Sequence, residues 1–312
     1  MTLHPALREL LADPSMTVRI PPPHVPMRKV RTAADAAMHR GAQPFMTSVE
    51  DMLVPADPPV PIRLYRPTAV RPAPAILFCH GGGFVWGSLE THDGLCRRIA
   101  TRTGALVFAV GYRLSPEAPF PAAQNDAFAV LEHLWTRAVA LGVDRKRIGV
   151  CGDSAGAFVA AHAAARFLAI GRSLAAMTLI YPALDPLCAR PSHAECADGP
   201  VLTTQAMDWF WAAHLPAGLP AGAPRLEDAP FPPTTILVAG YDPLRDEGRA
   251  FDAALRARGR EASLLEAPDM PHGFLSLPLD PALTDPWEAL LFPALHSRER
   301  ILPDPRDEVS GQ

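Results

Sequence analysis

The chain has 312 residues, of which 48% are hydrophobic and 20% are charged, a composition typical of a globular protein with an ample core. The formal net charge is −4 and no block of like charges occurs, so nucleic-acid binding and anionic membrane binding have little support. No continuous apolar stretch approaches the ~20 residues that span a bilayer, and the N-terminal sequence lacks a secretory signal pattern. We therefore expect a cytoplasmic protein with no membrane span.

The five cysteines are odd in number and include no CxxC pair. Cys79 and Cys151 end apolar runs, a position that predicts buried structural thiols. Cys188, His193 and Cys196 lie close together in the chain, but they lack the regular spacing of zinc ligands and a fourth partner. We expect no metal and no other cofactor.

From about residue 47, short apolar or β-branched runs alternate with helical patterns. The predicted strands cover residues 48–54, 62–65, 75–80, 105–110, 148–152, 177–181, 235–239 and 263–266. The predicted helices cover residues 94–102, 122–141, 155–170 and 249–258. This alternation predicts an α/β fold with a mainly parallel eight-stranded sheet flanked by helices. The first two strands are joined only by a proline-rich link, so they are expected to form an antiparallel edge.

Two regions stand outside this alternation, residues 1–46 and about 184–230. The second contains a helical amphipathic pattern over residues 203–214. Insertions late in an α/β chain often form lids above the functional site. We therefore expect one catalytic domain over residues 47–312, with a cap insert at about 184–230.

A G-x-S-x-G motif, GDSAG, occupies residues 152–156 between a predicted strand and a predicted helix. This context is the one that a nucleophile elbow requires, because the sharp turn leaves no room for side chains at the flanking positions. The turn would present the Ser154 hydroxyl above the sheet. That hydroxyl is a poor nucleophile until a base takes its proton, and the base must be oriented by an acid. In this architecture the chain order is serine, then acid, then histidine.

Five histidines follow the serine in the sequence. Four of them are poorly placed to act as the base: His162 on the next predicted helix, His193 and His214 in the cap insert, and His296 in a late helical segment. His272 follows the last predicted strand in the loop PDMPHGF. A base at the end of the last strand could meet a serine at the end of an earlier one, so His272 is the predicted base.

The predicted acid is Asp242, which lies just beyond the predicted strand at 235–239. Asp246 and Glu247 follow a turn later, where acidic residues favourably start a helix. Asp269 is only three residues before His272 on the same loop, whereas the acid is expected to come from a different strand end. Asp242 is therefore preferred to the other three carboxylates.

Three consecutive glycines follow the predicted strand at 75–80, within CHGGGF. Attack on a carbonyl places negative charge on its oxygen, and preorganised backbone N–H groups stabilise that charge. The predicted donors are the N–H groups of Gly82 and Gly83, together with that of Ala155 after the serine. Phosphate-binding alternatives fail, because Trp86 stands where G-x-G-x-x-G needs glycine and no G-K-[ST] sequence exists.

Aromatic residues lie beside both candidate elements. Phe84 and Trp86 follow the triple glycine directly and are predicted to contact substrate. Trp209, Phe210 and Trp211 lie at helical spacing in the cap insert, which favours a packing role.

Taken together, the motifs resemble the hormone-sensitive-lipase-like carboxylesterase branch of the α/β-hydrolase family. The stretches that carry the resemblance are HGGGF at 80–84, YRLSPEAPFPAA at 112–123, GDSAG at 152–156, DPLRDEG at 242–248 and HGF at 272–274. The resemblance implies a carboxylesterase for short- to medium-chain esters, with residues 1–46 forming a further part of the cap. It also implies that residues 112–121 brace the glycine loop, where Ser115 replaces the alanine of the family pattern.

The function expected from these residues is ester hydrolysis through an acyl-enzyme on Ser154. An amidase or lactonase could use the same three residues, so those reactions stay open. A non-catalytic binding protein on this fold is the alternative from another class, and it would be expected to lack the base or another of the three. The expected partner is a small ester, and a homodimer is possible.

Overall fold

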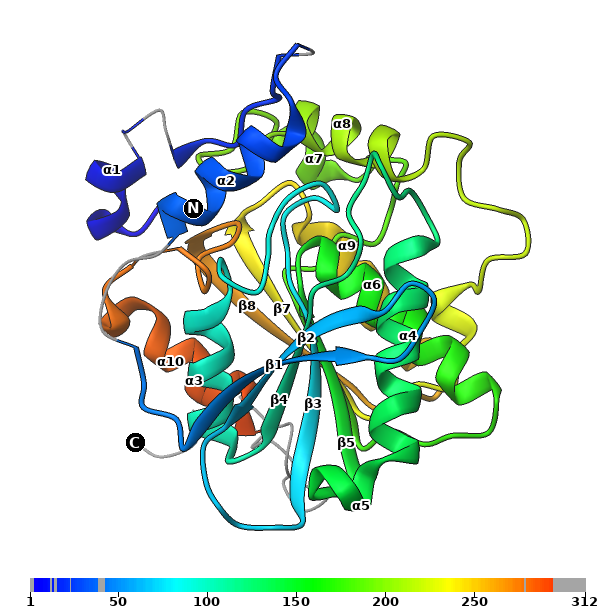
Figure 1. Ribbon diagram of the computed structural model, residues 1–312. Helices are drawn as coiled ribbons and strands as arrows, with labels where there is room; N and C mark the ends of the chain where they lie inside the picture. The colour runs from blue at the N-terminus through cyan, green and yellow to red at the C-terminus, as the bar shows by residue number, and fades with distance from the viewer. Residues whose placement is uncertain are drawn as a thin grey trace, which may run out of the picture.

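The computed structural model describes residues 3–11, 13, 16–22, 24–38, 43–277 and 279–293. Eight strands of this part of the chain form one sheet in the order β1-β2-β4-β3-β5-β6-β7-β8 (Figure 1). The strands are β1 Ser48–Val54, β2 Val60–Arg66, β3 Ala73–Cys79, β4 Leu106–Val110, β5 Val143–Asp153, β6 Ala176–Ile180, β7 Thr234–Tyr241 and β8 Ala262–Pro271. The predicted α/β architecture with an eight-stranded sheet is confirmed.

The strand pairings are parallel from β4 through β8 and antiparallel at the β1 end. β1 pairs with β2, and β2 pairs with β4 rather than with β3, the strand that follows it in the chain. The expected antiparallel edge is therefore present. β3 instead lies between β4 and β5 and is parallel to both, and a helical crossover joins it to β4, as a parallel pair requires.

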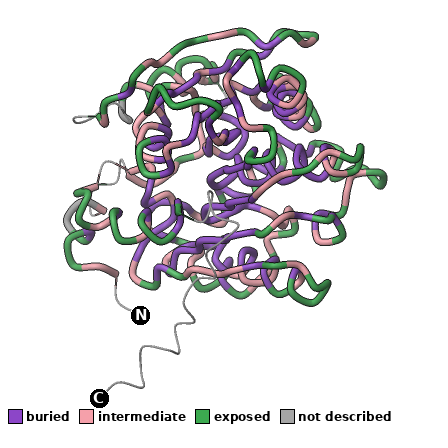
Figure 2. Tube along the Cα trace, turned by 90° about the horizontal axis from the view of Figure 1, so that it is seen from below, coloured by how far each residue is buried: buried purple, intermediate pink, exposed green. Residues whose placement is uncertain are grey.

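The strands β4, β6 and β7 are buried along almost their whole length. Every residue of β4 and β6 is buried, and seven of the eight residues of β7 are buried. Figure 2 shows this buried centre surrounded by helices with exposed outer faces. Continuous rather than alternating burial is expected where helices cover both faces of a parallel sheet.

Helices cover the two faces of the sheet. The helices are α3 Asp93–Thr103, α4 Ala122–Thr136, α5 Ala138–Leu141, α6 Ala155–Ala169, α9 Arg245–Ala257 and α10 Pro281–Leu291. Helices α3 and α10 lie on one side, and α4, α6 and α9 lie on the other (Figure 1). Arg98 and Arg102 of α3 bind the buried Glu288 carboxylate of α10 at 2.7 and 3.0 Å, which joins the first pair.

The sequence predicted one helix over residues 122–141, whereas the structure has two, α4 and α5, separated at Arg137. The Thr136 hydroxyl donates to the carbonyl oxygens of Glu132 at 2.7 Å and His133 at 3.3 Å. Such bonds back to the preceding turn compete with the helical ladder and bend helices. Helix α4 accordingly ends at Thr136, directly before the interruption at Arg137.

Strand β8 extends to Pro271, five residues beyond its predicted end. Prolines are tolerated there because, among the described residues, β8 is an edge strand with no strand partner on one side of its backbone. Asp269 consequently lies within β8 and not in a loop. The last strand therefore ends directly before His272. The predicted late helical position of His296 lies outside the described residues.

The remaining elements are α1 Pro5–Leu11, α2 Met27–Met38, α7 Pro191–Glu195, α8 Thr204–His214 and the short helix Leu226–Asp228. Helices α1 and α2 lie at the same end of the sheet as α7 and α8 (Figure 1). The N-terminal segment that carries α1 and α2 contacts the segment that carries α7 and α8: the Val18 N–H donates to the Val201 carbonyl oxygen at 2.7 Å. Across the described residues, no helix has both the length and the apolar character needed to cross a bilayer.

Candidate active site

Ser154 occupies the turn between β5 and α6. Its φ of 53° and ψ of −124° place a non-glycine residue at positive φ, which is a strained conformation. The turn is held by its backbone, since Ser154 N–H donates to the Ile180 carbonyl at 2.8 Å. Gly156 is required there, because a Cβ on it would lie 2.1 Å from the Cys79 carbonyl oxygen. The strand–turn–helix context that the motif predicted is present.

Ser154, His272 and Asp242 lie in one hydrogen-bonded series. Ser154 Oγ is 2.9 Å from His272 Nε2, and His272 Nδ1 is 2.7 Å from Asp242 Oδ2. The other Asp242 oxygen accepts from the Leu244 N–H at 2.8 Å, which fixes the carboxylate. With the Nδ1 proton directed at Asp242, Nε2 is left to accept the proton of the serine hydroxyl. The arrangement can therefore activate Ser154 as a nucleophile.

The other carboxylates considered from the sequence have different surroundings. Asp246 lies in the first turn of α9, where it binds Arg245 at 2.9 Å and Arg249 at 3.0 Å. Asp269 lies in β8, and its main-chain oxygen accepts from the His4 N–H. Asp242 is the carboxylate that contacts His272.

The triple glycine follows β3 and lies beside the serine turn. The Gly81 N–H is already used, because it donates to Asp153 Oδ1 at 2.8 Å. Within the described residues, no hydrogen bond uses the N–H of Gly82 or of Gly83. The Ala155 N–H belongs to the first turn of α6, where helix amides have no partner inside the helix. Three backbone donors are thus free to bind an anion.

Asp153 joins the glycine loop to the serine turn, a role that the sequence analysis missed. Besides the Gly81 N–H, its carboxylate contacts His92 Nε2 and Ser276 Oγ, each at 3.3 Å. Burial raises the pKa of Asp153, but its interactions with His92 and the hydrogen bond from the Gly81 N–H outweigh burial and hold this pKa below its usual range. The G-x-S-x-G pattern leaves this position open, so the only signal was a carboxylate next to the serine.

Residues 112–115 contact the glycine loop at two points. The Tyr112 hydroxyl donates to the His80 carbonyl at 2.5 Å, and the Ser115 N–H donates to the Phe84 carbonyl at 2.9 Å. The Tyr112 and His80 rings also stack, with centroids 4.2 Å apart. Burial lowers the pKa of His80 to about 3, so this ring is neutral at ordinary pH. These contacts give the loop the bracing that the family resemblance implied.

Aromatic rings surround Phe84, whose exposed fraction is 1%. It packs against Trp211 of α8 at 4.8 Å and against Phe158 of α6 at 5.7 Å between ring centroids. Trp86 is less buried and contacts the α8 residues Trp209 and Phe210. Helix α8 therefore covers the glycine loop.

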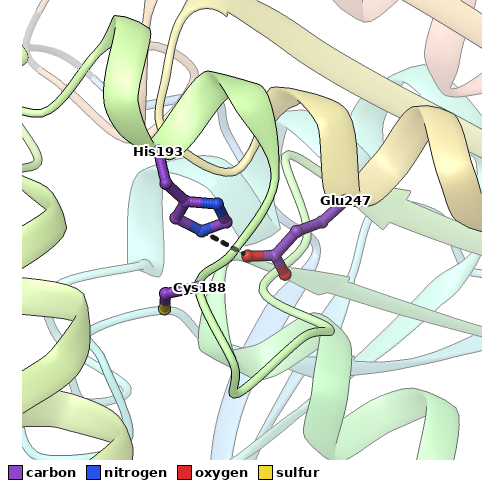
Figure 3. Close-up of side chains that lie close together, drawn as sticks. All are labelled: Cys188, His193 and Glu247. Atoms are coloured by element: carbon purple, nitrogen blue, oxygen red, sulfur yellow. Dashed lines mark ion pairs between the residues drawn. The ribbon is translucent and has the colours of Figure 1, made fainter.

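Cys188, His193 and Glu247 form a second cluster of side chains (Figure 3). His193 Nδ1 accepts from the Arg190 N–H, so the ring proton lies on Nε2, which faces Glu247 at 3.0 Å. The imidazole therefore has no free lone pair to offer a metal. Glu247 also accepts from the Leu184 and Asp185 N–H groups, so this pair anchors the loop after β6 to α9. The sequence analysis assigned Glu247 only to the helix start.

Comparison with known proteins assigns the fold to a family. A family model described as alpha/beta hydrolase fold matches residues 76–276. The chain belongs to the alpha/beta hydrolase family. It is 40% identical over 230 residues to the ethyl acetate hydrolase of Pseudomonas putida, covering 70% of this chain and 72% of that protein. It is also 40% identical to the esterase LipI of Mycobacterium tuberculosis, over 70% of this chain and 71% of LipI.

Solved structures agree with this assignment. The hyperthermophilic esterase from the archaeon Pyrobaculum calidifontis superposes with a TM-score of 0.84 and 33% sequence identity. The superposition covers 95% of this chain and 98% of that one. The resemblance to the α/β-hydrolase family that the motifs indicated is thereby confirmed.

Proposed function

We propose that this alpha/beta hydrolase is a carboxylesterase that cleaves short- to medium-chain esters. The observation that carries the proposal is the contact series Ser154–His272–Asp242, with free backbone amides beside it. Its family membership and its esterase relatives support the same activity.

In the proposed reaction, Ser154 Oγ attacks the ester carbonyl carbon while its proton passes to His272 Nε2. Asp242 stabilises the imidazolium that forms. The N–H groups of Gly82, Gly83 and Ala155 bind the oxyanion of the tetrahedral intermediate. When this intermediate collapses, the carbon–oxygen bond to the alcohol breaks and the alcohol takes the proton from His272.

The second half of the reaction releases the acyl group. A water molecule attacks the acyl-enzyme carbonyl and gives a proton to His272. The new tetrahedral intermediate then breaks its bond to Ser154, which recovers the proton, and the carboxylic acid leaves. The reaction needs only groups of this chain and water.

The cap assignment belongs to the same proposal. Residues 1–46 and the insert at 184–230 would form a cap over the catalytic domain. Their mutual contact through Val18 and Val201, and the packing of α8 on the glycine loop, support this division. Phe84 and Trp86 would then line the acyl side of the cleft beneath the cap. A cytoplasmic location and a homodimer remain predictions, and analytical ultracentrifugation of the full chain tests the dimer.

The test is steady-state hydrolysis of p-nitrophenyl acetate, butyrate, octanoate and palmitate. We expect the highest kcat/KM at acetate to octanoate, and a loss of about 10⁶-fold in kcat for Ser154→Ala. Ser173→Ala is the matched control, because Ser173 is an exposed serine in the loop after α6. An inert wild-type chain, or an active Ser154→Ala variant, would overturn the proposal. Activity confined to anilides or lactones would replace the ester assignment while keeping Ser154.

A further inference from the structure

A cavity of about 410 Å³ lies between α6, α9 and the segment that follows α8, and is called here the α6–α9 cavity. Its apolar walls include Phe158 of α6, Phe251 of α9 and Leu226 of the short helix Leu226–Asp228. Within the described residues, its lining includes neither Ser154 nor His272. The volume falls within the range of small-molecule sites in proteins.

His162 borders this cavity and has no polar partner in the part of the chain that the structure describes. Its side chain is 2% exposed, yet no hydrogen bond of the described residues reaches either ring nitrogen. Its contacts are instead the rings of Phe158 and Phe120, with centroids 4.3 and 5.7 Å away. Burial lowers the pKa of His162 to about 4, so the ring is neutral and offers one donor and one acceptor. A ring nitrogen that borders the cavity without a protein partner is open to a hydrogen bond from a group bound there.

The charges around the cavity are already paired with one another. The pairs are Arg190 with Asp185 at 3.2 Å, Arg225 with Glu227 at 2.8 Å, Arg258 with Asp228 at 2.8 Å, and His193 with Glu247 at 3.0 Å. Each charged side chain of the lining thus already has an ionic partner among the described residues. The neutral imidazole of His162 and the apolar walls therefore favour an uncharged ligand with an apolar body.

We propose that the α6–α9 cavity is a second binding site, separate from Ser154, for a small alcohol whose hydroxyl binds His162. A hydroxyl both donates and accepts, so it satisfies His162 in either neutral tautomer, whereas a carbonyl can only accept. The apolar part of the alcohol packs against Phe158, Leu226 and Phe251. The site does not depend on the proposed ester hydrolysis.

Benzyl alcohol is the probe, and the full-length chain is first treated with diethyl p-nitrophenyl phosphate to block Ser154. The binding of benzyl alcohol is followed by NMR of protein labelled with ¹³C at the histidine Cε1 position. The His162 signal is assigned by its absence from His162→Phe. We expect that signal to shift saturably with benzyl alcohol while Ser154 stays blocked.

Two variants locate the site independently. His162→Phe keeps the aromatic packing and removes the ring nitrogens, and Ala254→Phe fills the cavity from α9 with His162 in place. Because each variant carries its own evidence, a folding failure of one leaves the other decisive. In equilibrium dialysis with radiolabelled benzyl alcohol, we expect each of these two variants to bind the alcohol at least tenfold more weakly than the parent chain does. Ala253→Phe, the exposed neighbour on the same helix, should bind as the parent does.

Two results would overturn the proposal. One is loss of binding when Ser154 is blocked, which would place the alcohol in the serine cleft. The other is equal binding by the parent, His162→Phe and Ala254→Phe. If the phosphate ester fails to modify Ser154, the proposed function fails. In that case the two variants still decide the cavity site on the unmodified chain.

Discussion

The His214 imidazole and the Phe84 ring lie face to face, with centroids 4.0 Å apart and planes 5° apart. His214 Nδ1 is 3.0 Å from Ser115 Oγ, and its Nε2 is 3.1 Å from the amide nitrogen of Gln124. Since an amide NH₂ only donates, Nε2 accepts and the Nδ1 proton points to Ser115. Burial lowers the pKa of His214 to about 3, so the ring stays neutral. A fixed neutral histidine therefore joins α8 to the loop that carries Phe84.

Ser115→Ala should destabilise the protein, because it leaves the buried His214 Nδ1–H without an acceptor. We expect the free energy of unfolding in urea to fall by about 1–3 kcal/mol. Adding His214→Phe removes the orphaned donor, so the double variant should cost less than the sum of the two single changes. Simple additivity of the two changes would contradict the contact.

Asp242→Asn should lower kcat by about 10⁴-fold, because an amide in place of the carboxylate favours the wrong histidine tautomer. Asp269→Asn is the matched control, since Asp269 was the competing carboxylate near His272 in the sequence. It should keep kcat within about twofold of wild type, since its side chain does not orient His272. The opposite ranking of the two variants would assign the acid to Asp269.

Gly83→Ala should impair both folding and catalysis. The residue has a φ of +59°, and a Cβ there would lie 2.2 Å from the Phe210 ring of α8. The loop or the helix must then move, and displacing one oxyanion donor typically costs ~10²–10³ in kcat. Gly222→Ala, where a Cβ would meet nothing within 4 Å, is the control. Equal kcat and melting temperature for the two variants would argue against this packing.

Acid should destabilise the fold through three buried neutral histidines. Burial lowers the pKa of His80 and His214 to about 3 and that of His162 to about 4, whereas each regains an ordinary value on unfolding. Between these values and pH ~6.5 the unfolded chain binds more protons, so stability rises with pH across this window and is lost as pH falls. At ~1.4 kcal/mol per unit for each group, the slope is roughly 4 kcal/mol per pH unit.

Urea unfolding measured at half-unit steps from pH 7 to pH 5 checks this slope. His162→Phe, which removes one of the three groups, should reduce the slope by about a third. A flat profile over this range would mean that these rings are charged or solvated in the folded protein.

Arg31→Ala should lower the free energy of unfolding more than Glu117→Gln, which removes only the ionic partner of Arg31. The guanidinium donates to the Val85 carbonyl at 2.8 Å and the Ser115 carbonyl at 2.9 Å, and it also binds the exposed carboxylate of Glu117. Exposed ion pairs are worth little, whereas donors from a charged group to part-buried carbonyls are worth about 1.5–3 kcal/mol. Thermal unfolding should therefore separate Arg31→Ala from Glu117→Gln, whose effect should stay within about 0.5 kcal/mol. Equal losses would assign the contribution to the ion pair.

The sequence predicted the sheet well because its signals are local. Buried strands read as apolar runs, and the motifs mark strand ends, where the chain must turn sharply. The contact of His272 with both Ser154 and Asp242 followed from chain order, since parallel strands bring their carboxyl ends to one edge.

Contacts between distant segments left no such signal. The pairing of β2 with β4, the bond from Asp153 to Gly81 and the stacking of His214 on Phe84 depend on tertiary packing. From the sequence alone, one histidine or carboxylate could contact many different residues, and no local pattern selects its partner. The α6–α9 cavity was equally hidden, because it is a space between elements.

The contacts of the N-terminal segment also set an order of events during synthesis. Thr17 binds the Pro200 carbonyl, 183 residues later, and Arg31 binds Val85 and Ser115, 54 and 84 residues later. The segment precedes these partners in the chain, so the Arg31 contacts cannot form before residue 115 has emerged from the ribosome, nor the Thr17 contact before residue 200. Closing such long loops costs entropy that a folded surface must repay. Thr17 and Arg31 thus reach their native positions only after much later parts of the chain have been made.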